Sequence, residues 1–237
     1  MIGPRARIAD YLRRRLRVPT MASGLRRLAR NGLHPARAYD VGAYRGDFTA
    51  NLLLVWPRIE VVCFEPLPGK IDVVRKRFAT NPRVHGHDVV LGRASGETVS
   101  LALAETASSV LREHIDQPFL RIARETASID DLLVRGLLPG PADLIKIDVQ
   151  GYELSVLQGA QSTLEHASAL VVEANLLDVH RGVPLLHEVI AWLATRGFVA
   201  YDIAGLTRRP LDDALWQIDA VFVREDGALR ADKRWSA

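Results

Sequence analysis

Two glycines four residues apart, Gly42 and Gly46, directly follow an apolar run that ends at Val41. Glycine lets the backbone turn sharply and approach a ligand closely, and the start of a following helix presents free N–H groups. A carboxylate or a phosphate could therefore bind at this turn. A tight connection between a strand and a helix, without any ligand, is the alternative interpretation.

The next apolar run ends in an acidic residue, Glu65, 23 residues after Gly42. A carboxylate at that spacing can accept hydrogen bonds from both ribose hydroxyls, so the two features together indicate a nucleoside ligand. Dinucleotide-binding folds share this carboxylate, but they need a glycine where Tyr44 stands, because the pyrophosphate passes there. A methionine moiety does not need that glycine, and its ammonium group would suit the nearby Asp40.

A third candidate contact follows the apolar run that begins at residue 84. Asp88 is placed to accept a hydrogen bond from an adenine amino group, and Val89 to pack on the ring. A loop cap formed by Asp88 is the alternative.

Residues 143–160 combine an apolar run with charged side chains. Because side chains alternate along a strand, Lys146 and Asp148 lie on the same side, where an isolated charge would be costly. We expect them to pair with each other or with Glu173. The pattern becomes helical at Gly151, which leaves Asp148 and Gln150 at the carboxyl end of the strand.

Short β-rich runs alternate with helix-length periodic segments from residue 37 onward, which is typical of a parallel sheet covered by helices on both faces. The predicted strands span residues 38–41, 59–65, 84–90, 143–149, 168–174, 198–203 and 217–224. The predicted helices span 47–55, 69–80, 151–165 and 185–196. All seven strands fit one sheet, whose strand ends would carry the residues described above.

Residues 91–135 interrupt this alternation between the third and fourth strands. We expect an edge strand over 97–104, a loop over 107–111 and a short helix over 128–134 that Ser128 caps. Insertions at this level lie beside the carboxyl ends of the strands, so residues 105–125 are expected to contribute to the substrate mouth. A purely structural connector is the alternative.

Residues 1–37 contain ten arginines and one acidic residue, whereas the remainder of the chain has more acidic than basic residues. Two helices are expected, over 5–17 and 20–31, each with an apolar stripe among arginines. The pair could contact a membrane or a pathway enzyme, cover the active site, or pack with a solvated arginine face. We divide the chain into an N-terminal helical extension, 1–36, and a single domain, 37–237.

Composition sets outer limits on function. With 237 residues, 48% of them hydrophobic, the chain can bury one large core. Its lone cysteine, Cys63, lies in an apolar run, and no apolar stretch approaches the roughly 20 residues needed to cross a bilayer, so we expect a cytoplasmic protein. Because the basic charge is confined to one segment, we expect no nucleic-acid partner.

FkbM-family methyltransferases resemble this chain over about residues 39–205, through the segments DVGAYRGDFT, CFEP, VVLGRASGETVSL, TASIDDLL, LIKIDVQGYELSVLQGA and LVVEAN. The resemblance implies an α/β, Rossmann-like class I methyltransferase fold and S-adenosylmethionine as cofactor. It also implies O-methylation of a hydroxyl on a sugar, glycan or polyketide-type metabolite. Motifs and resemblance together predict cofactor contacts at Asp40, Gly42, Ala43, Gly46, Phe48, Glu65, Pro66, Asp88, Val89 and Asp148.

Two positions depart from the family pattern. The family often has Asn where this chain has Tyr44, which bears on the cofactor turn. It often has Glu where this chain has Gln150, which argues against residue 150 as an essential base.

Methyl transfer to oxygen requires a positioned hydroxyl and a proton acceptor. The candidate proton acceptors are Asp148, Glu173 and His180. We interpret Asp148 as base or orienting carboxylate, with Lys146 keeping it ionised and Glu173 or Asn175 holding the acceptor hydroxyl. The predicted substrate contacts are Gln150, Asn175 and His180, although a surface-loop histidine without a function would explain His180 as well. Asp148, Glu173 and Asn175 also offer oxygen ligands for Mg²⁺; a site without metal is the interpretation adopted.

Two other functions fit the same residues. A nicotinamide-dependent oxidoreductase would use the Gly-rich turn and Glu65, but no Y-x-x-x-K pair stands in a suitable place. A non-catalytic interaction protein would keep the fold and dock through its arginine-rich segment. No aromatic platform for a sugar stands out, and neither the acceptor nor the oligomeric state is indicated.

Overall fold

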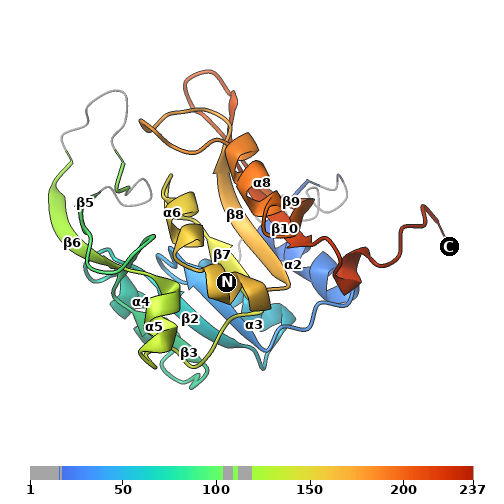
Figure 1. Ribbon diagram of the computed structural model, residues 1–237, viewed down its shortest axis with the longest axis horizontal. Helices are drawn as coiled ribbons and strands as arrows, with labels where there is room; N and C mark the ends of the chain where they lie inside the picture. Colours follow the sequence, from blue (N-terminus) through green and yellow to red (C-terminus); the bar gives the residue numbers. More distant parts are fainter. Residues whose placement is uncertain (1–15, 17, 104–108, 112–118, 237) are drawn as a thin grey trace, which may run out of the picture.

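The computed structural model describes residues 16, 18–103, 109–111 and 119–236. These residues form a three-layer α/β unit around a seven-stranded sheet (Figure 1). In spatial order its strands are β3 (Val84–His87), β2 (Glu60–Phe64), β1 (Arg37–Val41), β7 (Leu144–Ile147), β8 (Ala169–Asn175), β10 (Leu215–Arg224) and β9 (Phe198–Arg208). Neighbours from β3 to β8 are parallel, whereas β10 is antiparallel to β8 and β9. The predicted single sheet of seven mostly parallel strands is confirmed.

The strand order reverses beside β1, at the centre of the sheet. The chain runs outward from β1 through β2 to β3 and later returns to β7, on the other side of β1. Such a reversal opens a crevice outside the carboxyl ends of the strands, where α/β proteins bind ligands. The ends of β1, β2, β7 and β8 therefore face one shared space.

Helices cover both faces of the sheet. One face is covered by α2 (Met21–Arg30), α3 (Asp47–Val55) and α4 (Lys70–Arg77), which bury Leu25, Leu52 and Ile71 in one cluster. The other face is covered by α5 (Ile129–Val134), α6 (Glu153–Gln158), α7 (Gln161–His166) and α8 (Leu186–Ala194), with Leu157 and Leu193 in a second cluster. The parallel strands β1, β2, β7 and β8 are mostly buried on both faces, as the continuous apolar runs predicted, whereas the edge strand β3 is only partly buried.

A three-stranded sheet stands beside the main one. It consists of β4 (Val90–Leu91), β6 (Arg121–Ala127) and β5 (Thr98–Ala102), with β6 in the middle. The prediction of one strand over 84–90 was wrong, because β3 ends at His87 and the chain turns into β4, which pairs with β6. The predicted edge strand and Ser128-capped helix are present as β5 and α5, but β6 was not predicted, since two Arg and a Glu obscure its apolar alternation.

The single helix predicted over 151–165 is two helices, α6 and α7. A Cβ at Gly159 would lie 2.0 Å from the carbonyl oxygen of Gly92, and the Gly159 carbonyl accepts a hydrogen bond from the Asp130 N–H at 3.0 Å. This contact with neighbouring backbone interrupts the helix. Strand β9 is longer than predicted, because it continues past residue 203 to Arg208.

The second predicted N-terminal helix is present as α2, whereas the first, over 5–17, lies outside the described residues. Thr20 caps α2 in a reciprocal capping box with Ser23. Leu25 and Leu28 are each 1% exposed, and Arg27 forms an ion pair with Asp202 of β9 at 2.5 Å. The described part of the extension is thus packed onto the domain. Within the described chain, no helix has the length and apolarity to cross a bilayer.

Candidate functional site

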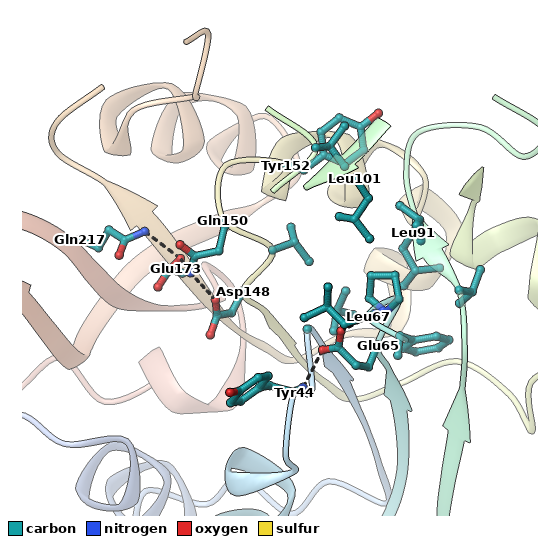
Figure 2. Close-up of a pocket in the computed structure, with 18 of the residues that line it drawn as sticks. Tyr44, Glu65, Leu67, Leu91, Leu101, Asp148, Gln150, Tyr152, Glu173 and Gln217 are labelled. Carbon is teal, nitrogen blue, oxygen red and sulfur yellow. Dashed lines mark hydrogen bonds between the residues drawn. The ribbon is translucent and has the colours of Figure 1, made fainter. Parts of the chain in front are cut away.

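A cavity of about 410 Å³ lies at the carboxyl ends of the central strands (Figure 2). Asp148, Gln150 and Glu173 gather at its polar end, and leucines including Leu67 and Leu91 line its apolar end (Figure 2). The cavity therefore offers one surface for a flat apolar group and another for polar chemistry, which is the usual composition of a small-molecule site.

Both glycines of the first turn adopt left-handed backbone, with φ of 77°. A Cβ at Gly42 would lie 1.8 Å from the carbonyl oxygen of Asp148, and one at Gly46 would lie 2.7 Å from the Phe78 ring. Glycine is required here because the backbone passes so close to its neighbours. Gly42 lines the cavity, whereas Gly46 begins α3 behind it.

Glu65 is held at the cavity wall by two backbone donors. Its Oε2 accepts a hydrogen bond from the Tyr44 N–H at 2.7 Å, drawn in Figure 2, and its Oε1 accepts one from the Leu67 N–H at 2.8 Å. Burial raises the pKa of this carboxyl, and the two N–H groups oppose that shift. Each carboxylate oxygen keeps further acceptor capacity, as the predicted ribose contact requires.

The two residues predicted to contact adenine are placed differently. Val89 lines the apolar end of the cavity, whereas Asp88 does not. The Asp88 carboxylate pairs with the Arg124 guanidinium at 2.5 Å, and its side chain is half exposed. Contact between Asp88 and an adenine amino group remains a prediction, and the adenine would have to share the Asp88 carboxylate with Arg124.

Asp40 lies beneath the cavity and does not line it. Its carboxylate accepts a hydrogen bond from Thr49 Oγ1 at 2.7 Å and lies 3.7 Å from Lys146 Nζ. Burial raises its pKa, and Lys146 opposes the shift. Of the other predicted cofactor residues, Pro66 lines the cavity, whereas Ala43 and Phe48 belong to the buried cluster around α3.

Lys146 joins the two acidic residues of the central strands. Its Nζ lies 3.0 Å from Asp148 Oδ2 and donates to the Gly42 carbonyl at 3.1 Å, which confirms the predicted pairing with Asp148. Burial by itself would lower the Lys146 pKa, but the carboxylates of Asp148 and Asp40 outweigh it and raise the pKa. Lys146 is therefore a permanent cation beside the polar end.

Gln150 bridges the two carboxylates at the polar end (Figure 2). Its Nε2 lies 3.1 Å from Asp148 Oδ1 and 2.8 Å from Glu173 Oε2, and Gln217 Nε2 donates to the same Glu173 oxygen at 2.9 Å. Burial, followed by the charge of Asp148, raises the Glu173 pKa well above its ordinary value. Gln217 was missed from the sequence, where its signal is a polar residue within the apolar run of β10, opposite Asn175.

The backbone that presents Gln150 is unusual and is fixed by Glu153. Gln150 has φ of 54° and Gly151 has φ of 99°. Glu153 Oε1 accepts hydrogen bonds from the Val149 and Gly151 N–H groups at 3.2 and 2.9 Å. Burial raises the Glu153 pKa to about 7. Glu153 therefore shapes the loop at the cavity.

Asn175 and His180 are both buried and do not line the cavity. Asn175 Oδ1 accepts a hydrogen bond from Gln217 Nε2 at 3.2 Å, which links it to Glu173. His180 is 2% exposed, so its interpretation as a surface-loop residue was wrong. Among the residues the structure describes, no three His, Cys, Asp or Glu side chains form a group suited to a metal ion.

Comparison with known proteins identifies a matching family and a similar protein. The model of the methyltransferase FkbM domain matches residues 40–200. The hexuronic acid methyltransferase AglP of Haloferax volcanii is 27% identical over 146 residues, which cover 61% of this chain and 56% of AglP. The chain thus aligns with little more than half the length of that relative.

Solved structures resemble the fold. The N-terminal domain of EvdMO1, crystallised with SAH bound, superposes with a TM-score of 0.50 at 12% identity, covering 86% of this chain and 81% of that one. A precorrin-6y C5,15-methyltransferase from Geobacter metallireducens gives a TM-score of 0.47 at 13% identity, covering 85% and 83% of the two chains. At such identity the EvdMO1 likeness supports the class I methyltransferase fold alone.

Proposed function

Because the chain belongs to the FkbM methyltransferase family, we propose that it transfers the methyl group of S-adenosylmethionine to a hydroxyl oxygen of a sugar, glycan or polyketide-type metabolite. One observation carries this proposal. A single cavity has a carboxylate suited to ribose, Glu65, on one wall and an ion-paired carboxylate, Asp148, on another. The AglP name favours a sugar among these acceptors.

The described residues fit the cofactor. Glu65 would accept hydrogen bonds from the ribose hydroxyls, and the leucines of the apolar end would enclose the adenine. The amino-acid tail would lie near Gly42 and Asp148, which both line the cavity. When bound, S-adenosylmethionine supplies an electrophilic methyl group, so the protein has to position the acceptor and remove its proton.

Asp148 is the proposed proton acceptor. Lys146 stabilises its negative charge at 3.0 Å, and the carboxylate would take up the proton that the acceptor hydroxyl gives up. Glu173, whose raised pKa favours the neutral form, would orient the hydroxyl as a hydrogen-bond partner. Gln150 keeps the two carboxyl groups at a constant separation.

Calorimetry and a transfer assay test the proposal. S-adenosylmethionine and S-adenosylhomocysteine should bind, and NAD should not, because Tyr44 replaces the glycine of a pyrophosphate site. Methyl transfer from labelled S-adenosylmethionine to a glycan panel then separates an enzyme from a non-catalytic protein of the same fold. Binding of NAD without binding of S-adenosylmethionine would refute the proposal.

The reaction is proposed to need no Mg²⁺. The oxygens of Asp148 and Glu173 already accept amide hydrogens from Gln150, and Lys146 lies beside Asp148, so a divalent cation would meet N–H groups and a positive charge. We expect turnover in excess EDTA to equal turnover with added Mg²⁺. Loss of activity in EDTA with recovery on adding Mg²⁺ would show that the carboxylates act as metal ligands instead.

A further inference from the structure

The hairpin of β9 and β10 forms a wall of the cavity that no cofactor contact uses. Thr207, Trp216 and Gln217 line the cavity from this hairpin, next to Glu173. The turn after β1 and the ends of β2 and β7 supply the proposed cofactor contacts. The hairpin therefore lies at the polar end of the cavity, on a wall that the proposed cofactor contacts leave open to the acceptor.

Trp216 reaches the cavity because β10 is irregular at that residue. Leu215 pairs with Arg208 and Gln217 with Thr207, so Trp216 is an extra residue between two pairs. Consecutive strand residues normally point to opposite faces, yet Trp216 and Gln217 both line the cavity. Bulges of this kind redirect a side chain beside active sites. The Trp216 carbonyl accepts a hydrogen bond from the Leu176 N–H at 2.7 Å, which fixes the bulge to the end of β8.

The indole of Trp216 has an unused donor. Its Nε1 is buried and has no hydrogen-bond partner in the described part of the chain, although the residue lines the cavity. Buried N–H groups nearly always have a partner, and the described residues supply none here. Indole offers an apolar face together with one donor. A sugar ring, with C–H faces and hydroxyl oxygens, matches both features.

The charge of the cavity restricts that sugar. The charged side chains among the described lining residues are Glu65, Asp148 and Glu173, and none of those lining residues is basic. Lys146 lies behind the wall at 6% exposure and is occupied by Asp148, Asp40 and the Gly42 carbonyl. A uronate carboxylate would face carboxyl groups without a cation to pair with.

We infer that the β9–β10 hairpin is the acceptor subsite, that Trp216 is its specificity-determining residue, and that the subsite takes an uncharged sugar. This inference rests on the proposed methyl transfer and narrows its acceptor. The proposed acceptor therefore differs from the hexuronic acid that the name of AglP gives for that protein.

The test compares two tryptophan variants with a control on matched glycosides. Trp216→Ala removes the ring, Trp216→Phe keeps an aromatic face without the N–H, and Trp192→Phe changes a half-buried tryptophan of α8 outside the cavity lining. The probes are p-nitrophenyl glucoside, galactoside and mannoside, and the glucuronide and galacturonide. S-adenosylhomocysteine release gives kcat and KM, and calorimetry gives S-adenosylmethionine affinity.

We expect a neutral glycoside to be methylated at least tenfold more efficiently than its uronide. Trp216→Ala should raise KM for that glycoside tenfold or more, Trp216→Phe by a smaller factor, and Trp192→Phe should match the parent. S-adenosylmethionine affinity should be equal in all four proteins.

Three results would overturn the inference. They are faster turnover of a uronide than of its neutral partner, an unchanged KM in Trp216→Ala, and no methylation of any glycoside by protein that binds S-adenosylmethionine. The last result leaves the cofactor assignment standing. Failure of the parent protein to bind S-adenosylmethionine at all would instead contradict the proposed function.

Discussion

Asp148 and Glu173 are joined through one amide group, yet their surroundings differ. Asp148 has a lysine ammonium at 3.0 Å, whereas Glu173 accepts hydrogen bonds from the neutral amides of Gln150 and Gln217. Burial raises the Glu173 pKa well above its ordinary value. A carboxyl that favours its neutral form beside one that pairs with a cation is typical of two groups with distinct tasks.

Asp148→Asn should lower kcat about 10²- to 10⁴-fold, since the amide cannot accept the proton, while cofactor affinity stays within a small factor of the parent. Glu173→Gln is the matched control, because an amide resembles a neutral carboxyl, and it should lose much less activity. Single-turnover rates and calorimetry measure both effects. Full turnover by Asp148→Asn, with a severe loss in Glu173→Gln, would reverse the two roles.

Glu153 should make stability depend on pH. Burial raises its pKa from 4.5 to about 7, so between those values the folded state holds a proton that the unfolded state has released. Glu153 therefore contributes to the free energy of unfolding below pH 4.5, and this contribution is lost as the pH rises through 7. The loss is on the order of 3 kcal/mol.

Glu153→Gln keeps a carbonyl acceptor for the two loop N–H groups but does not titrate. Its free energy of unfolding should therefore rise relative to that of the parent between pH 5 and pH 8. The exposed Glu165→Gln on α7 is the control and should follow the parent. Equal pH slopes in urea titrations of Glu153→Gln and the parent would show that Glu153 is not the source.

At the scale of elements, two loops that leave parallel strands are pressed together. The Asp148 N–H donates to the Val41 carbonyl at 3.0 Å, and a Cβ at Gly42 would lie 1.8 Å from the Asp148 carbonyl oxygen. The β1–α3 loop therefore positions Asp148 directly, through backbone packing. Ser109 adds a third segment, because its hydroxyl donates to the Gln150 carbonyl at 2.6 Å.

Gly42→Ala should destabilise the protein more than Gly69→Ala does. Both residues have left-handed backbone, with φ of 77° and 73°, but nothing lies within 4 Å of a Cβ at Gly69. Gly69→Ala should cost about 1 kcal/mol of backbone strain, and Gly42→Ala about 2 kcal/mol or more beyond that, because a backbone carbonyl must move. Urea unfolding measures the difference, and equal losses would mean that the two loops separate easily.

At the scale of the whole molecule, the helix α2 belongs to the packing of the α/β domain. Leu25 and Leu28 share a buried cluster with Leu52, and Gly24 packs against Ala204 of β9. Leu16 and Val18, which precede the helix, are exposed. The boundary proposed at 36/37 therefore separates sequence patterns, while the contacts of α2 cross it. Docking of the arginine-rich segment on a membrane or pathway enzyme remains a proposal.

Deletion of residues 1–36 should lower the free energy of unfolding by about 3–6 kcal/mol, since it removes two buried leucines. Deletion of residues 1–18 keeps Thr20 and all of α2, and should change stability by less than about 1 kcal/mol. Urea unfolding followed by tryptophan fluorescence compares both with the full chain. Equal stability of the two truncated proteins would show that α2 contributes little.

The central strands β1, β2, β7 and β8 were predictable because each is an apolar run that is mostly buried on both faces, and such runs leave a continuous signal. The Lys146–Asp148 pair was predictable for a similar reason, since alternation along one strand puts both on one side. Strand β6 was not predictable, because it lies in a small sheet with partly exposed strands and carries polar residues. The orientations of Asp40 and Asp88 depended on contacts with Thr49 and Arg124, which lie nine and 36 residues away and which no local pattern pairs with them.

The sequence by itself determined the family, the sheet and the strand ends at which chemistry would occur, because these depend on local composition and spacing. Only the tertiary structure decided that Gln217 and Trp216 share a cavity with Glu173, and that Glu153 shapes the loop of Gln150. Those contacts arise from an antiparallel pairing, a bulge and a backbone turn. Each depends on how distant segments pack, and no pattern of neighbouring residues specifies it.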